Sequence, residues 1–528
     1  MNTVAMLLVE TARNHPHAVG YEDQFNSISF SCAHNTAVQL ALTIRANDSE
    51  ANRCVHENGN LNPGKPILVY LPKGSTCIPA FFGCIYSCNP YVPVDYTQPM
   101  ERIRRMRDIS GARYVITDSA GCKRLRAEFG DSLTCIDIDS ISAELVTSDD
   151  LSVVLEGLNK VCDTDPAIIM FTSGSTGDPK GVTLSHRSVI DYANWIVDTF
   201  NFGTDTVLGG QAAFHFVSSV FDIFSVTLSG GKLITMPDKI FRFPQTIPQY
   251  LIDNKVTGFL WGPAIMKSIV KIGALDNTEL PDLKNCFFGG ELTSNATLNV
   301  WRRAVPQAQF INLYGMTETT SALLHYIVDR PYDDNEAIPA GVPCKNMRAF
   351  IVNPDGTLAS PGEVGEVCAC GTGLASGYWN NPDLTSRVFV QNPFNRAYRE
   401  IMLHTGDIGV MDTDGLITVK GRNDSQIQYR GNRIELGEID MAIAGIDEIV
   451  TGCVLYDQVN EELVLFAVFQ EDVQTGNMGS LLKDINTQLK ETLPAYMMLH
   501  RIQVLEEMPL TPSGKAHRLK LREMFLSE

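Results

Sequence analysis

A loop rich in Gly, Ser and Thr lies between two apolar segments at residues 171–181. Its sequence is Phe-Thr-Ser-Gly-Ser-Thr-Gly-Asp-Pro-Lys-Gly, and seven of these eleven residues are Gly, Ser or Thr. Such a loop can turn several backbone N–H groups and hydroxyls toward one anion, beside the ammonium group of Lys180. The apolar runs at 167–171 and 181–186 are typical of buried strands. A flexible linker is the alternative, but linkers seldom lie between two buried strands. The loop is therefore predicted to bind a polyphosphate, although it lacks the Gly-Lys-Ser/Thr of a Walker loop.

The rest of residues 1–420 alternates strand-like and helical patterns, as at 66–71 (strand), 102–109 (amphipathic helix) and 114–117 (strand). Such alternation predicts an α/β fold of mostly parallel sheets covered by helices. Beyond residue 424, two helical and two strand patterns at 434–443, 452–456, 462–470 and 481–493 predict a small α+β domain. We therefore expect a large domain over 1–423 and a small one over 424–528. The polar stretch 46–64 is expected to be an exposed loop.

Composition excludes several classes of protein. The net charge is −19, whereas a nucleic-acid-binding surface is usually basic. We find neither a run of about 18 apolar residues nor a signal sequence, which predicts a cytoplasmic protein without a membrane span. The 13 cysteines are scattered and are expected to be reduced thiols. Arg102, Arg104, Arg105 and Arg107 form one basic cluster, predicted to be a solvated helix face.

Further motifs follow the loop in order. They are Tyr-Gly-Met-Thr-Glu-Thr-Thr at 314–320, Gly-Leu-Ala-Ser-Gly-Tyr-Trp at 373–379, His-Thr-Gly-Asp at 404–407, Gly-Arg-Asn-Asp at 421–424 and Pro-Ser-Gly-Lys at 512–515. With the loop they resemble the motifs of the adenylate-forming enzymes, the superfamily of acyl-CoA ligases, luciferases and nonribosomal peptide adenylation domains. The resemblance covers almost the full chain. It implies a mobile C-terminal domain, the use of ATP and Mg²⁺, and formation of an acyl-adenylate.

The same resemblance implies roles for individual residues. Lys515 would bridge the substrate carboxylate and the α-phosphate, Thr317 would contact that phosphate, and Glu318 would bind Mg²⁺. Asp424 would be a hinge, and rotation there would replace Lys515 by residues 430–438. The remaining ATP contacts would come from Thr172, Ser173, Gly174, Ser175, Thr176, Gly177 and Lys180 at the β- and γ-phosphates, from Tyr314, Gly289, Gly290 and Glu291 at adenine, and from Asp407 and Arg422 at the ribose.

The branch of the superfamily is indicated by two segments. Residues 426–439 and 91–95 resemble peptide-synthetase adenylation domains more than acyl-CoA ligases. Only 13 residues follow Lys515, so we expect no fused carrier domain. The prediction is a stand-alone ligase that loads the phosphopantetheine thiol of a separate carrier protein, as D-alanine–carrier-protein ligases do. An acyl-CoA ligase that uses CoA, and a non-catalytic nucleotide-binding homologue, are the alternatives.

The predicted acid pocket departs from the amino-acid-activating pattern. Val217 stands where these relatives usually place an aspartate against the substrate α-ammonium. A buried ammonium without a partner would be costly. We therefore expect an acid without a free α-ammonium, or an amino acid whose ammonium contacts carbonyls, hydroxyls or Asp222, which is otherwise a structural residue. None of the other predicted lining residues carries a carboxylate: Ser218, Phe221, Leu260, Phe287, Gly289, Leu313, Ser321 and Ala322.

Overall fold

The computed structural model describes residues 3–47, 64–143, 146–174, 178–291, 293–333, 336–422, 426–470, 473, 477–510 and 516–525. The chain forms two compact units. The first comprises Met1–Tyr96, Ile109–Phe171 and Gly181–Asn423, and the second comprises Thr97–Asp108, Thr172–Lys180 and Asp424–Glu528. The second unit thus contains two short segments from the N-terminal part of the chain. The division into domains at residues 423 and 424 stays a prediction.

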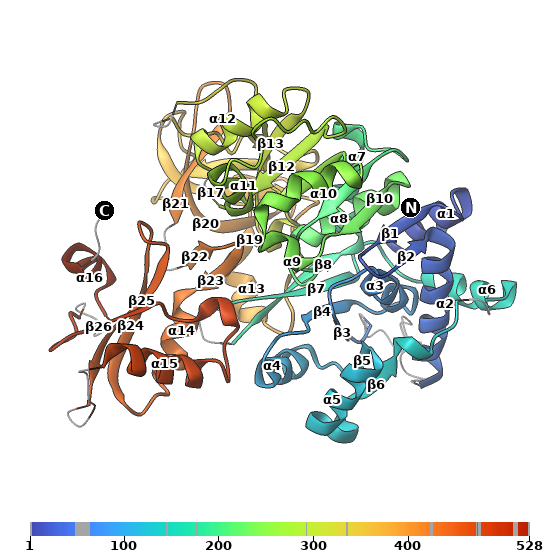
Figure 1. The fold of residues 1–528 in the computed structure, drawn as a ribbon, viewed down its shortest axis with the longest axis horizontal. Coiled ribbons are helices and arrows are strands. Elements are labelled where there is room, and N and C mark those ends of the chain that lie inside the picture. The colour runs from blue at the N-terminus through green and yellow to red at the C-terminus, as the bar shows by residue number, and fades with distance from the viewer. Residues whose placement is uncertain are drawn as a thin grey trace. The chain divides into compact units, whose positions relative to one another are not determined.

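A nine-stranded sheet of the first unit has the order β15-β14-β13-β12-β11-β9-β10-β1-β2. Its central strands pair in parallel, as predicted, and the pairs β1–β2, β13–β14 and β14–β15 are antiparallel. Helices α10 (Ile247–Asp253), α11 (Pro263–Lys271) and α12 (Asn295–Ala304) lie over one face of β11–β13 (Figure 1). The strands are β1 Val19–Glu22, β2 Ser27–Ser29, β9 Val207–Gly210, β10 Lys232–Thr235, β11 Gly258–Trp261, β12 Asn285–Gly289, β13 Gln309–Tyr314, β14 Leu324–Ile327 and β15 Val342–Pro343.

A seven-stranded sheet has the order β18-β8-β7-β4-β3-β5-β6, with parallel pairing among β3–β7. It holds the two apolar strands predicted beside the Gly/Ser/Thr loop, which are β7 Pro166–Thr172 and β8 Lys180–Ser185. The prediction of two strands that border the loop is therefore confirmed. The other strands are β3 Ile67–Leu71, β4 Tyr91–Asp95, β5 Tyr114–Thr117, β6 Thr134–Asp137 and β18 Gly377–Tyr378.

A third sheet is antiparallel, which the strand–helix alternation did not predict. It consists of β16 Met347–Val352, β17 Val364–Gly371, β19 Phe389–Gln391, β20 Ile401–Met411 and β21 Ile417–Arg422. Between its strands lie only one short helix and the two-residue strand β18, which pairs with β8, so antiparallel pairing needs no long crossover. The helices of the first unit are α1 Ala5–Asn14, α2 Phe30–Asn47, α3 Cys77–Tyr86, α5 Ser119–Phe129, α6 Ser148–Leu158, α7 His186–Phe200, α8 Ser218–Ser229, α9 Asp238–Phe241, α10 Ile247–Asp253, α11 Pro263–Lys271, α12 Asn295–Ala304 and α13 Pro382–Val388.

The second unit is α+β, as predicted. Its core is formed by β24 and β25, which pair antiparallel, by β26, which pairs parallel with β25, and by the helices packed on them. The helix expected from residue 434 begins at Leu436, because residues 432–435 form a strand with β22. The elements are α4 Met100–Ser110, which extends into the first unit, β22 Gln426–Tyr429, β23 Asn432–Glu435, α14 Leu436–Ile443, β24 Ile449–Asp457, β25 Glu462–Phe469, α15 Met478–Leu489, β26 Arg501–Val504 and α16 Arg518–Phe525.

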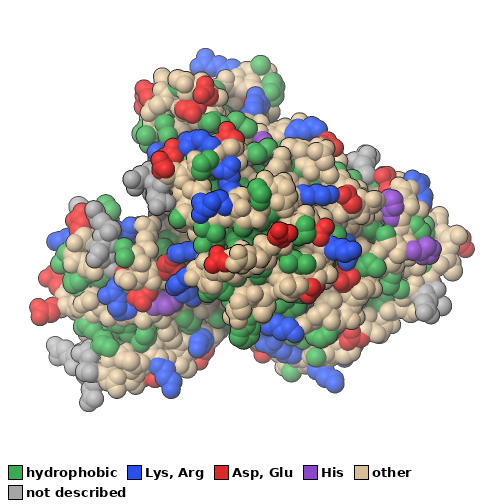
Figure 2. Space-filling view, turned by 45° about the horizontal axis from the view of Figure 1, so that its top comes forward, with side chains coloured by type: hydrophobic (Ala, Val, Ile, Leu, Met, Phe, Trp, Pro, Cys, Tyr) green, Lys and Arg blue, Asp and Glu red, His purple; other side chains and the backbone are tan. Residues whose placement is uncertain are grey.

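The surface carries charges of both signs. On the face drawn in Figure 2, Lys and Arg side chains are interspersed with Asp and Glu. That face therefore gives no argument for a docking surface of one sign. Of the described helices, none combines the length and apolar character needed to cross a membrane.

Candidate active site

Three predicted nucleotide-binding residues meet in the first unit. Asp407 lies in β20 and is 6% exposed, and its Oδ1 accepts a hydrogen bond of 2.7 Å from Arg422 Nη1. Its Oδ2 accepts a hydrogen bond from the Tyr314 hydroxyl at the end of β13. Burial, and then the Asp407 carboxylate, raises the pKa of the Tyr314 phenol. The hydroxyl therefore stays protonated and donates, and the buried carboxylate is stabilised by two donors.

The predicted magnesium ligand is buried beside a tyrosine. Glu318 lies in the 3₁₀ turn η4 Thr317–Thr319, directly after β13, and is 1% exposed. Its Oε1 accepts a hydrogen bond of 2.8 Å from the Tyr378 hydroxyl, and its backbone carbonyl accepts one of 2.9 Å from Ala375 N–H. Mg²⁺ is usually held by one or two carboxylates together with phosphate oxygens. A single oriented carboxylate fits that pattern. Tyr378 had no role in the sequence prediction, although it lies in the motif at 373–379.

The predicted adenine-side glycines follow β12. Gly289 pairs with Leu313, and a Cβ at position 289 would lie 2.1 Å from the Leu313 carbonyl oxygen. Gly290 has a φ of +85°, which only glycine adopts readily. Both positions therefore require glycine for a close backbone approach. Glu291 follows them, at the end of this described stretch.

Four predicted pocket residues share one face of the nine-stranded sheet. Leu260 pairs with Phe287 and Gly289 pairs with Leu313, and paired residues of neighbouring strands point to the same side. The Phe287 ring contacts Phe221 of α8 at a centroid distance of 4.8 Å. The remaining members lie nearby in the chain: Val217 directly before α8, Ser218 as its first residue, and Ser321 and the buried Ala322 after η4.

Asp222 is a buried carboxylate in the second turn of α8. It is 1% exposed, and no hydrogen-bond partner for its Oδ1 is found among the described residues. Burial raises its pKa to about 7, and the Lys73 ammonium opposes that shift. Lys73 Nζ donates to the backbone carbonyls of Gln211 (2.7 Å) and Met236 (3.3 Å). Asp222 is thus isolated from water, and its Oδ1 lacks the hydrogen-bond partner that an oxygen of a buried carboxylate normally has.

The described part of the phosphate loop contacts the C-terminal segment within the second unit. The Ser173 hydroxyl donates to the Arg433 carbonyl (2.9 Å) and accepts from Glu435 N–H (3.1 Å). A Cβ on Gly174 would lie 2.0 Å from the Asp178 carbonyl oxygen, so position 174 requires glycine. Thr172 ends β7 and Lys180 begins β8. Ser175, Thr176 and Gly177 lie outside the described residues, as do Lys515 and Asp424.

The expectation of a solvated basic helix face is wrong for Arg102. Arg102 is 5% exposed and forms an ion pair with Glu438, which is 1% exposed. Glu438 also accepts a hydrogen bond from the Gly174 backbone. Arg104 and Arg105 are partly exposed, with side-chain exposures of 38% and 37%. The helix sequence alone does not reveal this ion pair, because Glu438 lies 336 residues further along the chain than Arg102.

Comparison with known proteins places these motifs in a family. The protein-family model described as "AMP-binding enzyme" matches residues 9–379 of this chain. The chain is 31% identical over 489 residues to tyrocidine synthase 3 of Brevibacillus parabrevis, covering 92% of this chain but 7% of that protein. It is 29% identical over 464 residues to the D-alanine–D-alanyl carrier protein ligase of Bacillus cytotoxicus, covering 86% of this chain and 88% of the ligase.

A solved structure shows the same fold. The Vibrio cholerae adenylation domain AlmE in complex with glycyl-adenosine-5′-phosphate superposes with a TM-score of 0.81 at 19% identity, covering 99% of this chain and 97% of that chain. At that identity the similarity establishes the fold alone. The family match spans most of the chain and confirms the resemblance inferred from the motifs. The chain belongs to the AMP-binding enzyme family, whose members are adenylate-forming enzymes that use ATP.

Proposed function

We propose that this protein activates a carboxylic or amino acid with ATP and Mg²⁺ and transfers the acyl group to the phosphopantetheine thiol of a separate carrier protein. The observation that carries the adenylation step is a contact among three motifs. Tyr314 of one motif and Arg422 of another both donate hydrogen bonds to the buried carboxylate of Asp407, which belongs to a third. The acceptor is inferred from the D-alanyl carrier protein ligase, because that relative and this chain match over most of both lengths.

In the first half-reaction, an oxygen of the substrate carboxylate attacks the α-phosphorus of ATP, and the bond from that phosphorus to the bridging oxygen of pyrophosphate breaks. The charge on the transferring phosphoryl group is stabilised by positioned donors and cations rather than by acid–base chemistry. Lys515 and Thr317 would contact the reacting groups, and Lys180 with the Gly/Ser/Thr loop would hold the β- and γ-phosphates. Asp407 would accept the ribose hydroxyls.

Glu318 would hold the magnesium ion, with the Tyr378 hydroxyl fixing one carboxylate oxygen. Bound Mg²⁺ neutralises phosphate charge during such a transfer. In the second half-reaction, the carrier thiol attacks the acyl carbonyl carbon, and the bond between that carbon and the AMP oxygen breaks. The thiol proton goes to solvent or to AMP. A rotation at Asp424 would separate the two half-reactions.

For the acid, we propose a small or medium apolar substrate without a free α-ammonium. The predicted lining supports this, since Leu260, Phe287 and Leu313 are apolar and at most 9% exposed. Asp222 is the alternative partner for a substrate amino group, because it is buried and its Oδ1 has no partner among the described residues. Matched acids that differ only in the α-substituent distinguish the two possibilities.

The deciding experiment is acid-dependent exchange of labelled pyrophosphate into ATP, run over a panel of matched amino, hydroxy, β-amino and unsubstituted acids. Exchange with any acid supports adenylation, and no exchange over the panel favours a non-catalytic homologue. The best acid is then offered CoA and a set of phosphopantetheinylated carrier proteins. Thioester on a carrier supports the proposal, whereas thioester on CoA alone identifies an acyl-CoA ligase.

A further inference from the structure

Asp407 lies in a β-bulge of strand β20. Strands β17 and β20 pair Glu366 with Ile408 and Cys368 with His404, so two steps along β17 oppose four steps along β20. The extra residues are accommodated in 405–407. Gly406 in the middle has a φ of +76°, a conformation that favours glycine. Bulges of this kind re-aim a side chain relative to the regular ladder.

Side chains satisfy the backbone groups that the bulge removes from the ladder. The Asp407 N–H donates to Thr405 Oγ1 (3.0 Å), and that hydroxyl donates to the Val367 carbonyl (2.7 Å). The Gly406 N–H donates to Glu366 Oε1 (2.9 Å). The Thr405 carbonyl accepts from Arg422 Nη2 (3.3 Å). Glu366 therefore accepts the hydrogen bond of the residue directly before Asp407.

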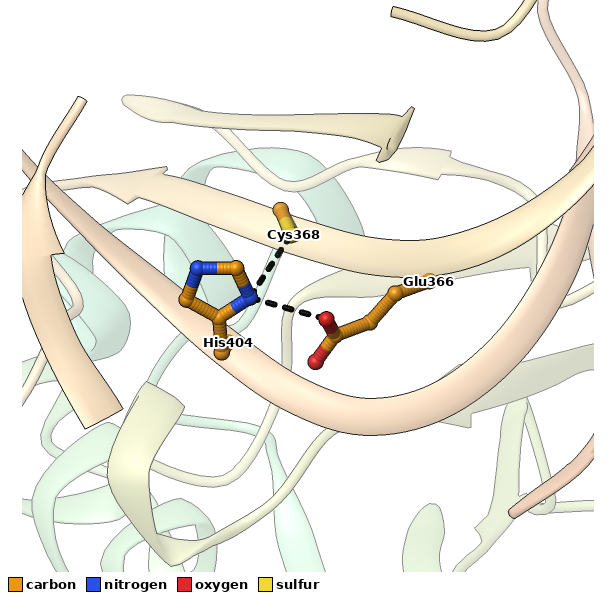
Figure 3. A group of neighbouring side chains, drawn as sticks. All are labelled: Glu366, Cys368 and His404. Carbon is orange, nitrogen blue, oxygen red and sulfur yellow. Dashed lines mark hydrogen bonds and ion pairs between the residues drawn. The ribbon is translucent and has the colours of Figure 1, made fainter. Parts of the chain in front are cut away.

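The second oxygen of Glu366 is fixed by a histidine. Figure 3 shows Glu366 and Cys368 facing His404, whose Nδ1 lies 2.8 Å from Glu366 Oε2 and 3.7 Å from Cys368 Sγ. Burial raises the pKa of the Glu366 carboxyl, but the His404 side chain and the Gly406 N–H outweigh burial and leave the pKa lowered. The Glu366 carboxylate is thus a charged acceptor with one oxygen on the histidine and the other on the bulge.

A metal site is the other interpretation of these three side chains. Two ligands on a tetrahedral metal, each bonded at about 2.1 Å, lie roughly 3.4 Å apart. The observed 2.8 Å between Nδ1 and Oε2 is shorter and is a normal hydrogen-bond distance. In addition, burial raises the pKa of the Cys368 thiol, which disfavours the thiolate that a metal requires. The geometry favours hydrogen bonding.

We propose that Glu366 is a positioning residue for ribose recognition: it holds the β20 bulge in the shape that directs Asp407 to the nucleotide. The inference rests on the proposed function, in which Asp407 accepts the ribose hydroxyls. Without the Glu366 carboxylate, the Gly406 N–H loses its acceptor, and the contact between the Thr405 hydroxyl and the Val367 carbonyl is left to hold the bulge to β17. Affinity for the ribose hydroxyls then falls, while contacts to the base and phosphates are retained.

The test is calorimetric binding of ATP and of 2′,3′-dideoxy-ATP to the full-length protein and to Glu366→Ala. Wild type is expected to bind ATP more tightly. Glu366→Ala is expected to weaken ATP binding roughly tenfold and to change dideoxy-ATP binding less than twofold, because hydrogen bonds to charged groups are worth that order of affinity. Glu366→Gln should retain the ATP preference, since its amide oxygen can accept from Gly406 N–H.

Glu363→Ala is the matched control. Glu363 is an exposed glutamate just before β17 that caps the turn at Ser360, so its removal is expected to leave both affinities unchanged. If Glu366→Ala weakens the binding of both nucleotides equally, or leaves the preference for ATP unchanged, the role of Glu366 is overturned while the role of Asp407 stands. Equal binding of both nucleotides by wild type would overturn the role of Asp407, and with it the inference and the nucleotide site of the proposed function. One equivalent of zinc in purified wild type, lost in Cys368→Ala, would assign the group to a metal instead.

Discussion

Replacing Asp222 by Asn is expected to stabilise the protein increasingly as the pH rises. Asp222 lies inside α8, 1% exposed, with its Oδ1 lacking a partner among the described residues. Burial raises its pKa from 3.8 to about 7, against the opposing influence of Lys73. The native protein therefore retains a proton that the unfolded chain releases near pH 4. Ionising the carboxylate in place is what costs stability.

The sign and size follow from linkage. Between pH 4 and pH 7 the folded state binds more protons than the unfolded state, so the free energy of unfolding falls as the pH rises. The full difference between pKa values of 3.8 and about 7 corresponds to about 4 kcal/mol, at about 1.4 kcal/mol for each pH unit. Between pH 5 and pH 8 the expected loss is about 3 kcal/mol. The asparagine side chain of Asp222→Asn does not titrate, so the variant avoids this loss.

The assay is urea denaturation followed by tryptophan fluorescence at several values between pH 5 and pH 8, for wild type and Asp222→Asn. The quantity of interest is the difference in unfolding free energy between the two proteins, because the other titrating groups cancel in it. Asp253→Asn, at an exposed position of α10, is the control and should differ from wild type by no more than about 0.5 kcal/mol. A difference for Asp222→Asn that does not change with pH would refute a protonated buried carboxylate.

Three further predictions concern catalysis. Lys515→Ala should reduce pyrophosphate exchange about a hundredfold or more while ATP binding measured by calorimetry persists, and a wild-type exchange rate would contradict the role of Lys515. Asp424→Pro should impair thioester transfer more than adenylation, because it restricts backbone rotation at the hinge; equal losses in the two half-reactions would count against two active states. Val217→Asp should lower turnover of the native acid by placing an unpaired carboxylate against an apolar substrate, and a clear wild-type preference for an L-α-amino acid over its deaminated counterpart would overturn that interpretation of the pocket.

The strands around the phosphate loop were predictable because they are short apolar runs with turn residues at their ends. Such runs are buried on both faces in a parallel sheet, and their pattern is local. The third sheet was not recognised, because its antiparallel strands lie among turns and one short helix rather than alternating with long helices. The helix at 434 was predicted too early for a similar reason. Residues 432–435 pair with β22, and pairing is not visible in the periodicity of a single segment.

The motifs predict which residues belong to the nucleotide site, but they do not predict the hydrogen bonds that hold those residues in place. Two hydrogen bonds do not follow from the spacing along the chain: the one that the Tyr378 hydroxyl donates to Glu318, and the one that the Gly406 N–H donates to Glu366. The bulge depends on a mismatch of register between two strands, and register is fixed by packing as well as by sequence. Arg102 shows the same limit. A basic helix face is solvated by default, and only the fold reveals a buried partner such as Glu438.

The Ser173 hydroxyl links the phosphate loop to the proposed change of state. A serine hydroxyl has one proton to donate, whereas phosphate oxygens only accept. In this structure that proton is donated to the Arg433 carbonyl. Ser173 therefore cannot donate to Arg433 and to a phosphate at the same time. If the loop binds the β- and γ-phosphates through this hydroxyl, the contact with residue 433 must open first. Residue 433 follows the predicted hinge, Asp424, by nine positions and shares a compact unit with the loop here, so the proposed rotation would have to separate residues 433–435 from Ser173.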